Sequence, residues 1–336
     1  MKLIKTIILL ISLLPSICNN TIARNTSSNP AINSFIDIKL NGIKQKILVQ
    51  SNDLNNPVLL WLHGGPGTSE MFINHYCMNK VLDYFTIVHW DQRGTALSYN
   101  KNIKGKDISF DKILDDAAKL TKILKQKYKQ KKIFIIGHSF GSVLGIHLIN
   151  KYPDNYFAYV GIGQVVDENK SQEITYDWFI KKLKENNDNA ELSKLRKTKK
   201  ISRELIDKYK GIFWKEKRLM DVIKESPYYY KEYHDIYLES MKFVRIALSK
   251  NPSVQEKNIL KDICKVNVPI YFFEGRHDRI AACAPELVVE YNRILKAPRH
   301  EIIWFDESAH HPNIDEPNKF QSVMIDKVLK ENYKKN

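Results

Sequence analysis

A serine lies between two glycines at the end of an apolar segment, in the sequence Gly137-His138-Ser139-Phe140-Gly141. Residues 133–137 have the pattern of a short buried strand, and residues 141–152 have helical spacing. Between a strand and a helix, the flanking glycines permit a sharp turn that exposes the serine hydroxyl at the carboxyl edge of a sheet. The motif therefore predicts that Ser139 is a nucleophile.

A serine hydroxyl is a weak nucleophile at neutral pH unless a histidine takes its proton and an acid orients that histidine. Where the serine occupies such an elbow, the acid and then the histidine follow it along the chain. Asp278 and His310 have this order, and each lies in a loop that follows a predicted strand. Asp306 and His311 remain the alternative acid and the alternative base.

A second glycine-rich turn, His63-Gly64-Gly65-Pro66-Gly67, follows another predicted strand. Such a turn lets backbone N–H groups point into a pocket. One of them, together with the N–H of Phe140, would form an oxyanion hole. The alternative is a tight turn with a structural role only. A phosphate-binding loop is excluded, because the Lys-Ser/Thr ending is absent.

These residues need a sheet that brings strand ends together. The apolar pattern predicts strands at 35–40, 44–50, 58–63, 85–90, 133–137, 156–163, 269–274 and 301–304. Helical spacing occurs at 110–129, at 141–152, between the last two strands and from 317 onward. Strands that alternate with helices indicate an α/β fold with a mostly parallel central sheet flanked by helices.

The alternation stops over residues 167–266, which are polar, charged and aromatic with helix-like spacing. We therefore predict one α/β core in two parts, 35–166 and 267–336, interrupted by an inserted helical cap at 167–266. An insertion at this point would cover the sheet edge as a lid.

The N-terminus has the pattern of a signal peptide. Two lysines precede an apolar run that ends at Cys18, which is too short for a comfortable membrane span. We predict a signal peptide at 1–18, with cleavage as late as 23, and a flexible leader at 19–34. The protein is then secreted or extracytoplasmic. It would contact the membrane only through this segment, if the segment stays uncleaved or is lipidated at Cys18.

The chain has 53 Lys and Arg against 38 Asp and Glu, a net charge of +15. These residues are spread along the sequence without a binding motif, so we expect no nucleic-acid partner. Beyond the leader, Cys77, Cys264 and Cys283 lack metal-ligand spacing, although one pair could form a disulfide. The sequence implies neither a metal nor an organic cofactor.

Taken together, four segments resemble the proline iminopeptidase family of α/β-hydrolases. They are His63–Gly67, Trp90-Asp-Gln-Arg-Gly94, Gly137–Gly141, and Ser308-Ala-His310 followed by Glu316-Pro317. The resemblance extends over about residues 35 to 332 and is weak in the cap. It implies an α/β-hydrolase fold with a helical cap.

The resemblance also implies roles for individual residues. Ser139 would be the nucleophile, His310 the base and Asp278 the orienting acid. The oxyanion would be held by the N–H groups of Gly65 and Phe140. The resemblance assigns His63, Gly64, Asp91 and Arg93 to shaping the site.

Family members release N-terminal residues, often proline, from short peptides and hold the free amine with acidic residues of the lid. No carboxylate of the cap can be matched by motif, and Glu173 is a candidate because it lies near the start of the cap. Its alternative is a solvated glutamate at the start of a helix. The chain also departs from the family at Gly161-Ile-Gly-Gln164 and at Ala96, which leaves proline specificity open.

We therefore predict a serine hydrolase that cleaves N-terminal residues from short peptides through a Ser-His-Asp acyl-enzyme. One alternative is a carboxylester hydrolase on the same triad. Another is a ligand-binding homologue without turnover.

Overall fold

The structure is a computed structural model that describes residues 31–250 and 258–334. The predicted signal peptide and residues 19–30 of the predicted leader lie outside the described residues. None of the helices within the described ranges has the length and apolar character needed to cross a membrane.

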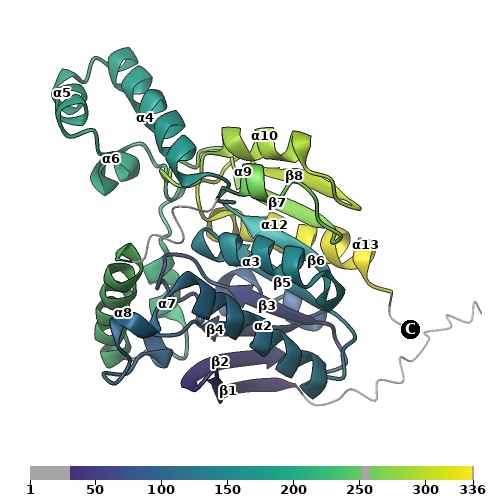
Figure 1. Ribbon diagram of the computed structural model, residues 1–336. Helices are drawn as coiled ribbons and strands as arrows, with labels where there is room; N and C mark the ends of the chain where they lie inside the picture. Colours follow the sequence, from purple (N-terminus) through teal and green to yellow (C-terminus); the bar gives the residue numbers. More distant parts are fainter. Residues whose placement is uncertain (1–30, 251–257, 335–336) are drawn as a thin grey trace, which may run out of the picture.

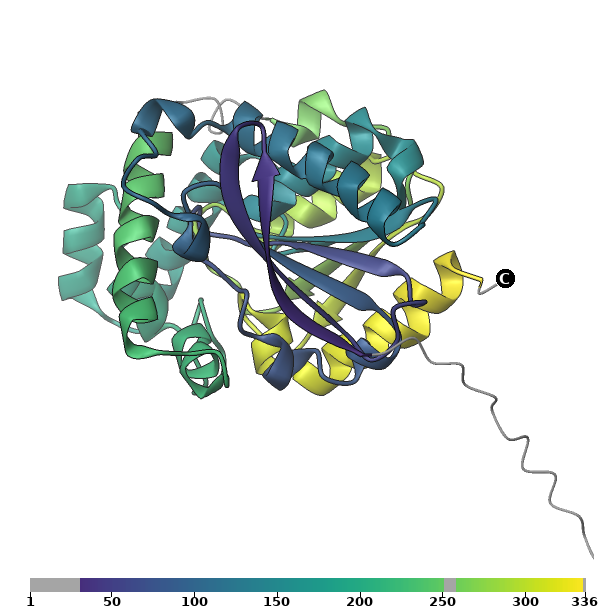
Figure 2. The ribbon, with the colours of Figure 1, turned by 90° about the horizontal axis from the view of Figure 1, so that it is seen from below.

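A single mixed sheet forms the centre of the protein (Figures 1 and 2). Its strands are β1 (Ile32–Leu40), β2 (Ile43–Ser51), β3 (Val58–Leu62), β4 (Thr86–Asp91), β5 (Ile133–His138), β6 (Tyr156–Ile162), β7 (Ile270–Gly275) and β8 (His300–Phe305). Their order in the sheet is β1-β2-β4-β3-β5-β6-β7-β8. The pairs β1–β2 and β2–β4 are antiparallel, and the remaining pairs are parallel. This arrangement confirms the predicted fold class.

The sheet opens with a hairpin that turns at Asn41 and Gly42, whose φ angles of 45° and 86° suit this short turn. The predicted leader extended to residue 34, but β1 begins at Ile32. Its pairing with β2 continues to Ser51, so the ladder also takes up Asn33 and Ser34. The sequence pattern did not predict these two residues as strand because their side chains are polar, but an edge strand tolerates polar residues on its exposed face.

Helices cover both faces of the sheet (Figure 2). One apolar core joins the sheet to α2, α3 and α10, and a second joins it to α1, α12 and η6. The helices of these layers are α1 (Asn74–Cys77), α2 (Phe110–Lys127), α3 (Phe140–Lys151), α10 (Pro285–Ile294), α11 (Pro312–Asp315), α12 (Pro317–Val323), the π-helix η6 (Met324–Leu329) and α13 (Lys330–Asn332). Short 3-10 helices are η1 (Val81–Asp83), η2 (Ala96–Ser98), η3 (Gly105–Asp107) and η4 (Pro153–Asn155).

Burial explains why the strands read as continuous apolar runs. Every residue of β3, β4 and β5 is buried, because helices pack on both sides of them. The strand β4, which precedes α2 in the chain, ends at Asp91. Because the strands from β4 to β8 run parallel, they all end at the same edge of the sheet. That edge is where the loops after β3, β5, β7 and β8 meet.

The chain between β6 and β7 forms helices over its described residues. They are α4 (Glu168–Glu185), α5 (Asn189–Thr198), α6 (Arg203–Lys208), α7 (Leu219–Glu225), α8 (Lys231–Ser249) and α9 (Ile259–Asp262). A bridge between Asp167 and Asn258, with a 2.6 Å side-chain hydrogen bond, ties the two ends of this insertion together. We call α4–α8 the cap.

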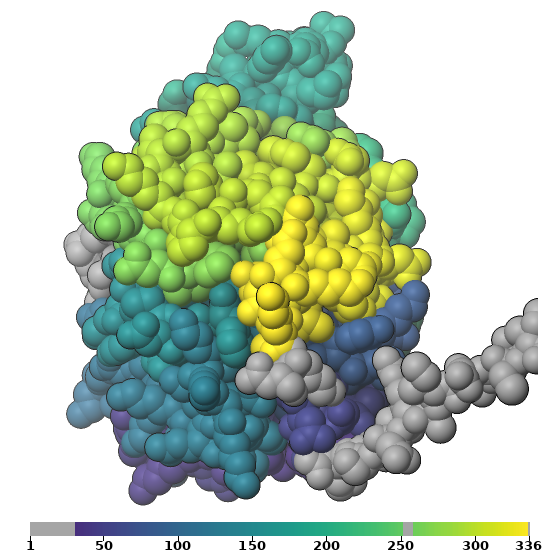
Figure 3. Space-filling model, turned by 90° about the vertical axis from the view of Figure 1, so that its right-hand side faces the viewer, coloured from purple at the N-terminus to yellow at the C-terminus, as the bar shows by residue number. Residues whose placement is uncertain are grey.

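The cap lies on one side of the core (Figure 1, left). Helices α4, α5 and α6 extend away from the sheet, whereas α7 and α8 lie nearer to β1 and β2. The last described helix, α13, lies on the opposite side, where residues near the C-terminus form part of the surface (Figure 3). The cap covers the carboxyl ends of the strands, because Ser139 after β5 and His310 after β8 line the same cavity as the cap residue Arg203.

Candidate active site

Ser139 stands at a strained turn between β5 and α3. Its backbone has φ 51° and ψ −118°, a conformation that residues other than glycine rarely adopt. The backbone N–H of Ser139 donates to the carbonyl of Ile162 at 2.9 Å, which holds the turn against β6. The sheet therefore fixes the serine at the strand end that the motif predicts, where its side chain is largely buried and lines two cavities.

Close backbone packing requires glycine at both positions that flank the turn, Gly137 and Gly141. A Cβ on Gly141 would lie 2.1 Å from the carbonyl oxygen of Leu62, and a Cβ on Gly137 would lie 2.3 Å from the carbonyl oxygen of Gly141. Because backbone atoms on both sides cannot move away, only glycine lets α3 start this close to β3 and β5.

Asp278 and His310 come together at the same edge. Asp278 follows β7 and is fully buried, and its Oδ2 lies 2.6 Å from Nδ1 of His310, in the loop after β8. The second oxygen of Asp278 accepts the N–H of Ile280 at 2.8 Å. A buried carboxylate on Nδ1 holds the proton on that nitrogen, which leaves Nε2 of His310 as the basic atom.

Gly163 makes room for this pair. Its φ is 51°, and a Cβ there would lie 2.8 Å from both Cε1 and Nδ1 of His310. The same Cβ would lie 3.3 Å from the nearer carboxylate oxygen of Asp278. The sequence Gly161-Ile-Gly-Gln164, which looked like a departure from the family, therefore carries a glycine that the acid–histidine pair needs.

The alternative acid and base have other surroundings. Asp306 has a side chain that is 64% exposed and pairs with Arg276 at 3.0 Å. His311 is buried and stacks on the ring of Phe213, with 4.3 Å between centroids. Burial, reinforced by the neighbouring histidines, holds the pKa of His311 well below its usual range. Thus His310, not His311, carries the buried carboxylate partner.

The glycine-rich turn after β3 lies beside the serine. Gly65, Phe140 and Ser139 line one cavity, so the two backbone segments predicted to form the oxyanion hole meet at Ser139. A Cβ on Gly65 would lie 2.7 Å from the backbone nitrogens of Gly67 and Thr68, at a φ of 113°. A Cβ on Gly64 would lie 3.1 Å from the Cβ of Ser139.

His63 supports this turn as a neutral imidazole. Its Nδ1 lies 2.9 Å from the carbonyl of Gly64, and its Nε2 accepts the N–H of Gln92 at 3.2 Å. The first nitrogen must donate and the second must accept, so the ring carries one proton. Burial lowers the pKa of His63 to about 4, which keeps it neutral near pH 7.

Asp91 and Arg93 lie below the site. Asp91 is buried and accepts hydrogen bonds from the hydroxyl of Ser69 and the N–H of Leu97. Burial raises the pKa of Asp91 to about 7. Arg93 forms two charge-assisted hydrogen bonds, at 2.7 and 2.8 Å, to Asp116 on α2. Neither residue is among those that line the two cavities at Ser139, so both act through the loops they hold.

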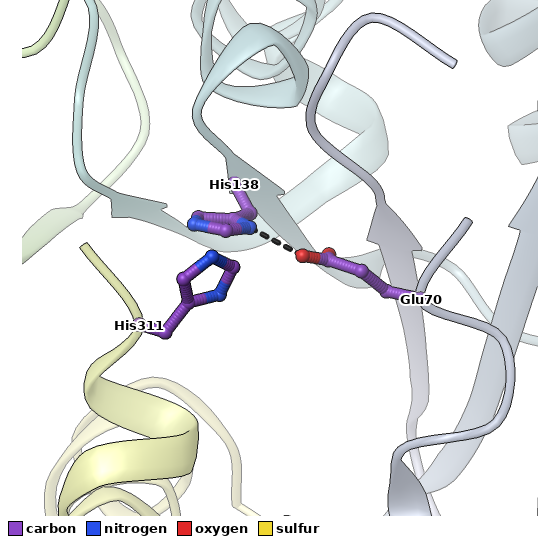
Figure 4. Close-up of side chains that lie close together, drawn as sticks. All are labelled: Glu70, His138 and His311. Carbon is purple, nitrogen blue, oxygen red and sulfur yellow. Dashed lines mark hydrogen bonds and ion pairs between the residues drawn. The ribbon is translucent and has the colours of Figure 1, made fainter. Parts of the chain in front are cut away.

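The sequence analysis did not predict a buried ion pair between His138 and Glu70, which lies next to Ser139 and His310. Nδ1 of His138 lies 2.5 Å from Oε1 of Glu70, and Nε2 of His138 lies 3.0 Å from the backbone carbonyl of His310 (Figure 4). The other oxygen of Glu70 accepts the indole N–H of Trp61 at 2.7 Å. Both ring nitrogens of His138 face acceptors, so both must donate and the ring is an imidazolium.

The charges of this pair support each other. Burial disfavours a charged imidazole, but the Glu70 carboxylate outweighs burial and raises the pKa of His138. Burial likewise opposes ionisation of Glu70, and His138 outweighs it and lowers the pKa of Glu70. The sequence could have drawn attention to His138, because it lies inside the serine motif, but no known spacing connects it with Glu70, 68 residues away.

Glu70, His138 and His311 are also the cluster of metal-ligand types found within the described ranges, with ligand atoms within 4.8 Å of one another. The His311 ring lies beside the His138 ring, with 4.6 Å between their centroids (Figure 4). The donor types suit a transition metal. A metal ion here would have to displace the proton that His138 donates to Glu70, so the arrangement is that of an ion pair.

Two cavities meet at Ser139. The smaller, of about 230 Å³, is lined mainly by apolar side chains, with Glu168 at the start of α4 and Arg245 on α8 as its charged residues. The larger, of about 620 Å³, lies between the sheet edge and the cap and is lined by Ser139 and His310. Glu173, the carboxylate predicted to bind substrate, is exposed on α4 and lines neither cavity. It lies five residues after Glu168, about 140° further round the helix.

The three cysteines of the described residues are free, so the structure has no disulfide among them. Cys283 is buried, with its Sγ 3.9 Å from the oxygen of Ser139. Burial raises the pKa of Cys283 well above its usual range, so the thiol stays protonated.

Comparison with known proteins identifies the family of the chain over most of its length. A family model described as serine aminopeptidase, S33, matches residues 55–317. The probable aminopeptidase YbaC of Bacillus subtilis is 29% identical over 305 residues, which cover 86% of this chain and 94% of that protein. A proline iminopeptidase of Saccharolobus solfataricus is 22% identical, covering 82% and 86% of the two chains.

Among solved structures, the proline iminopeptidase of Mycobacterium smegmatis superposes with a TM-score of 0.63 at 13% identity, covering 87% of this chain and 96% of that one. At this identity the likeness concerns the fold. With the family match, it shows that the chain belongs to the serine aminopeptidase family S33, the proline iminopeptidase-like serine hydrolases of the α/β-hydrolase fold.

Proposed function

We propose that the protein is an aminopeptidase that releases a small N-terminal residue, proline among them, from short peptides. The family supplies the reaction class, and two relatives are named as an aminopeptidase and a proline iminopeptidase. The observation that carries the proposal is Glu168, a half-buried carboxylate that is the only acidic residue among those lining the small cavity beside Ser139.

The first half of the reaction uses the three side chains at the sheet edge. His310 takes the proton of Ser139 as the serine oxygen attacks the substrate carbonyl. Asp278, at 2.6 Å, stabilises the imidazolium that forms. His310 then gives the proton to the leaving nitrogen, the carbon–nitrogen bond breaks, and an acyl-enzyme on Ser139 remains. Water, with His310 again as base, releases the free amino acid.

The negative charge that develops on the carbonyl oxygen needs donors fixed in advance. We assign these to the N–H groups of Gly65 and Phe140, which line the smaller cavity with Ser139. The N–H of Phe140 lies at the start of α3, where the helix end also favours negative charge. Removing one such donor costs about 3 kcal/mol of transition-state stabilisation in other serine hydrolases.

The smaller cavity suits one compact residue with a free amine. Val143, Val165 and Leu248 supply apolar contacts, and the volume of about 230 Å³ limits the side chain. Burial raises the pKa of Glu168, whose carboxylate accepts a 3.3 Å hydrogen bond from Gln172. Arg245 lines the same cavity, but its hydrogen bonds go to Pro66 and Thr68 and not to Glu168. A substrate ammonium would stabilise the ionised form and would be held within reach of Ser139.

The test compares cleavage of arylamides of proline, alanine and leucine with cleavage of N-blocked proline arylamide and of a short-chain aryl ester. We expect Ser139-dependent turnover of the free-amine compounds and loss of turnover on N-blocking. Replacing Glu168→Gln should lower kcat/KM for free-amine arylamides at least about tenfold and change ester cleavage little, because the ester has no ammonium.

Glu173→Gln is the matched control, since it removes a carboxylate from the same helix outside the cavities. Ester cleavage alone would support a carboxylester hydrolase on the same triad. Folded protein without Ser139-dependent turnover of any compound would contradict the proposal and support a ligand-binding homologue.

The N-terminal pattern supports the further proposal that the enzyme acts outside the cytoplasm. Fractionation of cells that produce the full chain, with N-terminal sequencing of the mature protein, tests this. Recovery of the protein in the cytoplasm with its first residues intact would contradict it.

A further inference from the structure

The larger cavity at Ser139 is strongly basic. Three arginines from separate parts of the cap line it: Arg203 at the start of α6, Arg218 just before α7, and Arg245 on α8. The carboxylates among the lining residues are Asp207 and Glu70. Glu70 is already neutralised by His138, so one carboxylate faces three guanidinium groups.

The Asp207 carboxylate does not form a close hydrogen bond with either arginine that it faces. Asp207 Oδ1 lies 3.6 Å from Nη1 of Arg218, and its Oδ2 lies 3.9 Å from Nε of Arg203. Both distances exceed those of a hydrogen bond. Nη1 of Arg218 is buried and has no hydrogen-bond partner among the described residues. A buried guanidinium nitrogen without an acceptor is costly, and an anion in the cavity would remove that cost.

Arg245 adds to the excess of positive charge. It lies where the two cavities meet and lines both. Its hydrogen bonds to the described residues are long, at 3.4 Å to the carbonyl of Pro66 and to the hydroxyl of Thr68. Burial lowers the pKa of Arg245, and the positive charge of Arg203 adds a smaller contribution in the same direction. The arginines thus form a site with spare positive charge and spare donors.

The position of His310 shows which part of a substrate enters this cavity. His310 lines the larger cavity and not the smaller one. The histidine must protonate the leaving group, so the leaving part of the substrate lies on its side of Ser139. The residue that becomes the acyl group then occupies the smaller cavity with Glu168.

We propose that the arginines Arg203, Arg218 and Arg245 bind a carboxylate on the leaving part of the substrate. The preferred substrates are then very short peptides, held by the amine at Glu168 and by a carboxylate at the arginines. Arginine suits this task, because its planar fork of donors matches a carboxylate. The inference rests on the proposed function for the identity of the leaving group.

The experiment measures kcat/KM for three peptides: prolyl-alanine, prolyl-alanine amide and prolyl-aspartate amide. The first has a terminal carboxylate, the second has none, and the third has only a side-chain carboxylate. We expect prolyl-alanine to exceed its amide at least about tenfold, the effect of one charge-assisted contact. A preference for prolyl-aspartate amide would identify the side chain as the source of the carboxylate.

The variant Arg203→Gln/Arg218→Gln should bring the acid-to-amide ratio close to one. Lys199→Gln, which removes an exposed cation of the cap outside the cavity, should keep the wild-type ratio. Circular dichroism and a thermal melt show whether each variant is folded.

A second pair of substrates separates the inference from the proposed function. Acetyl esters of 4-hydroxybenzoate and 4-hydroxybenzamide have leaving groups that differ in one carboxylate and need no amine site. If the enzyme cleaves no peptide but prefers the benzoate ester, and the double variant loses that preference, the aminopeptidase proposal fails and the carboxylate site stands. If peptides are cleaved with equal kcat/KM for acid and amide, or the ratio survives in the double variant, the carboxylate site is overturned.

Discussion

The sheet edge and the cap handle charge in opposite ways. At the sheet edge, three buried carboxylates each have a buried partner: Asp278 with His310, Glu70 with His138, and Asp116 with Arg93. In the cap, Arg203 and Arg218 have side chains 65% and 41% exposed and share one distant carboxylate. The core thus holds Asp278 and His310 in a fixed geometry, whereas the cap leaves positive charge without a close counter-charge.

The largest effect should come from the sheet edge. Ser139→Ala should lower kcat/KM about 10⁴-fold or more, because the nucleophile acts as a unit with His310 and Asp278. The thermal melting curve should stay close to that of the wild type, since the hydroxyl makes only a long contact with Cys283. A variant that keeps a tenth of the activity would contradict the assignment of Ser139 as nucleophile.

Breaking the buried ion pair should cost stability more than any change in the cap. Glu70→Gln leaves the His138 imidazolium buried beside a neutral amide, and removing one partner of a buried pair costs about 3–5 kcal/mol. Urea unfolding of wild type and variant measures this difference. An unchanged free energy of unfolding near pH 6 would show that His138 is neutral in the folded protein.

The pH dependence of that difference has a defined sign. The pKa of His138 is raised on folding, so its contribution is complete below about pH 6.5 and disappears as the pH rises through the folded pKa. The pKa of Glu70 is lowered, so its contribution is present above about pH 4.5 and is lost as the pH falls through its folded value. Wild type should therefore exceed Glu70→Gln most between these limits.

A smaller change tests how tightly the core positions the histidine. Gly163→Ala places a Cβ 2.8 Å from the His310 ring, so we expect kcat/KM to fall at least about tenfold. Gly42→Ala is the matched control: its φ is 86°, but a Cβ there meets nothing within 4 Å. Both variants suffer backbone strain of about 1 kcal/mol, and only the first should lose activity. Equal losses in both would assign the effect to strain alone.

The smallest effect should be in the cap. Arg203→Gln should change the free energy of unfolding by less than about 0.5 kcal/mol, because its ion pair with Asp207 is long and exposed. A loss above 1 kcal/mol in urea unfolding would mean that the arginine stabilises the cap, and the contrast between the two regions would weaken.

The elements of the core were predictable because local patterns specify them. The apolar runs of β3 and β5 and the glycines around Ser139 express buried strands and a sharp turn directly in the sequence. The structure moved element ends by a few residues, as at β1, where pairing with β2 extends the strand. Asp278 and His310 could be named in advance because chain order restricts which residues reach the edge next to Ser139.

The amino-acid sequence by itself thus determined the fold class and gave Ser139, Asp278 and His310 as the candidate triad. Only the tertiary structure decided which charges are compensated. Glu70 and His138 are 68 residues apart in the chain, and Arg203, Arg218 and Arg245 come from different parts of the cap. Likewise, the packing of α4 places Glu168, and not Glu173, at the smaller cavity. The reason is physical: backbone preferences act between neighbours in sequence, whereas electrostatic pairing depends on distances that exist only in the folded chain.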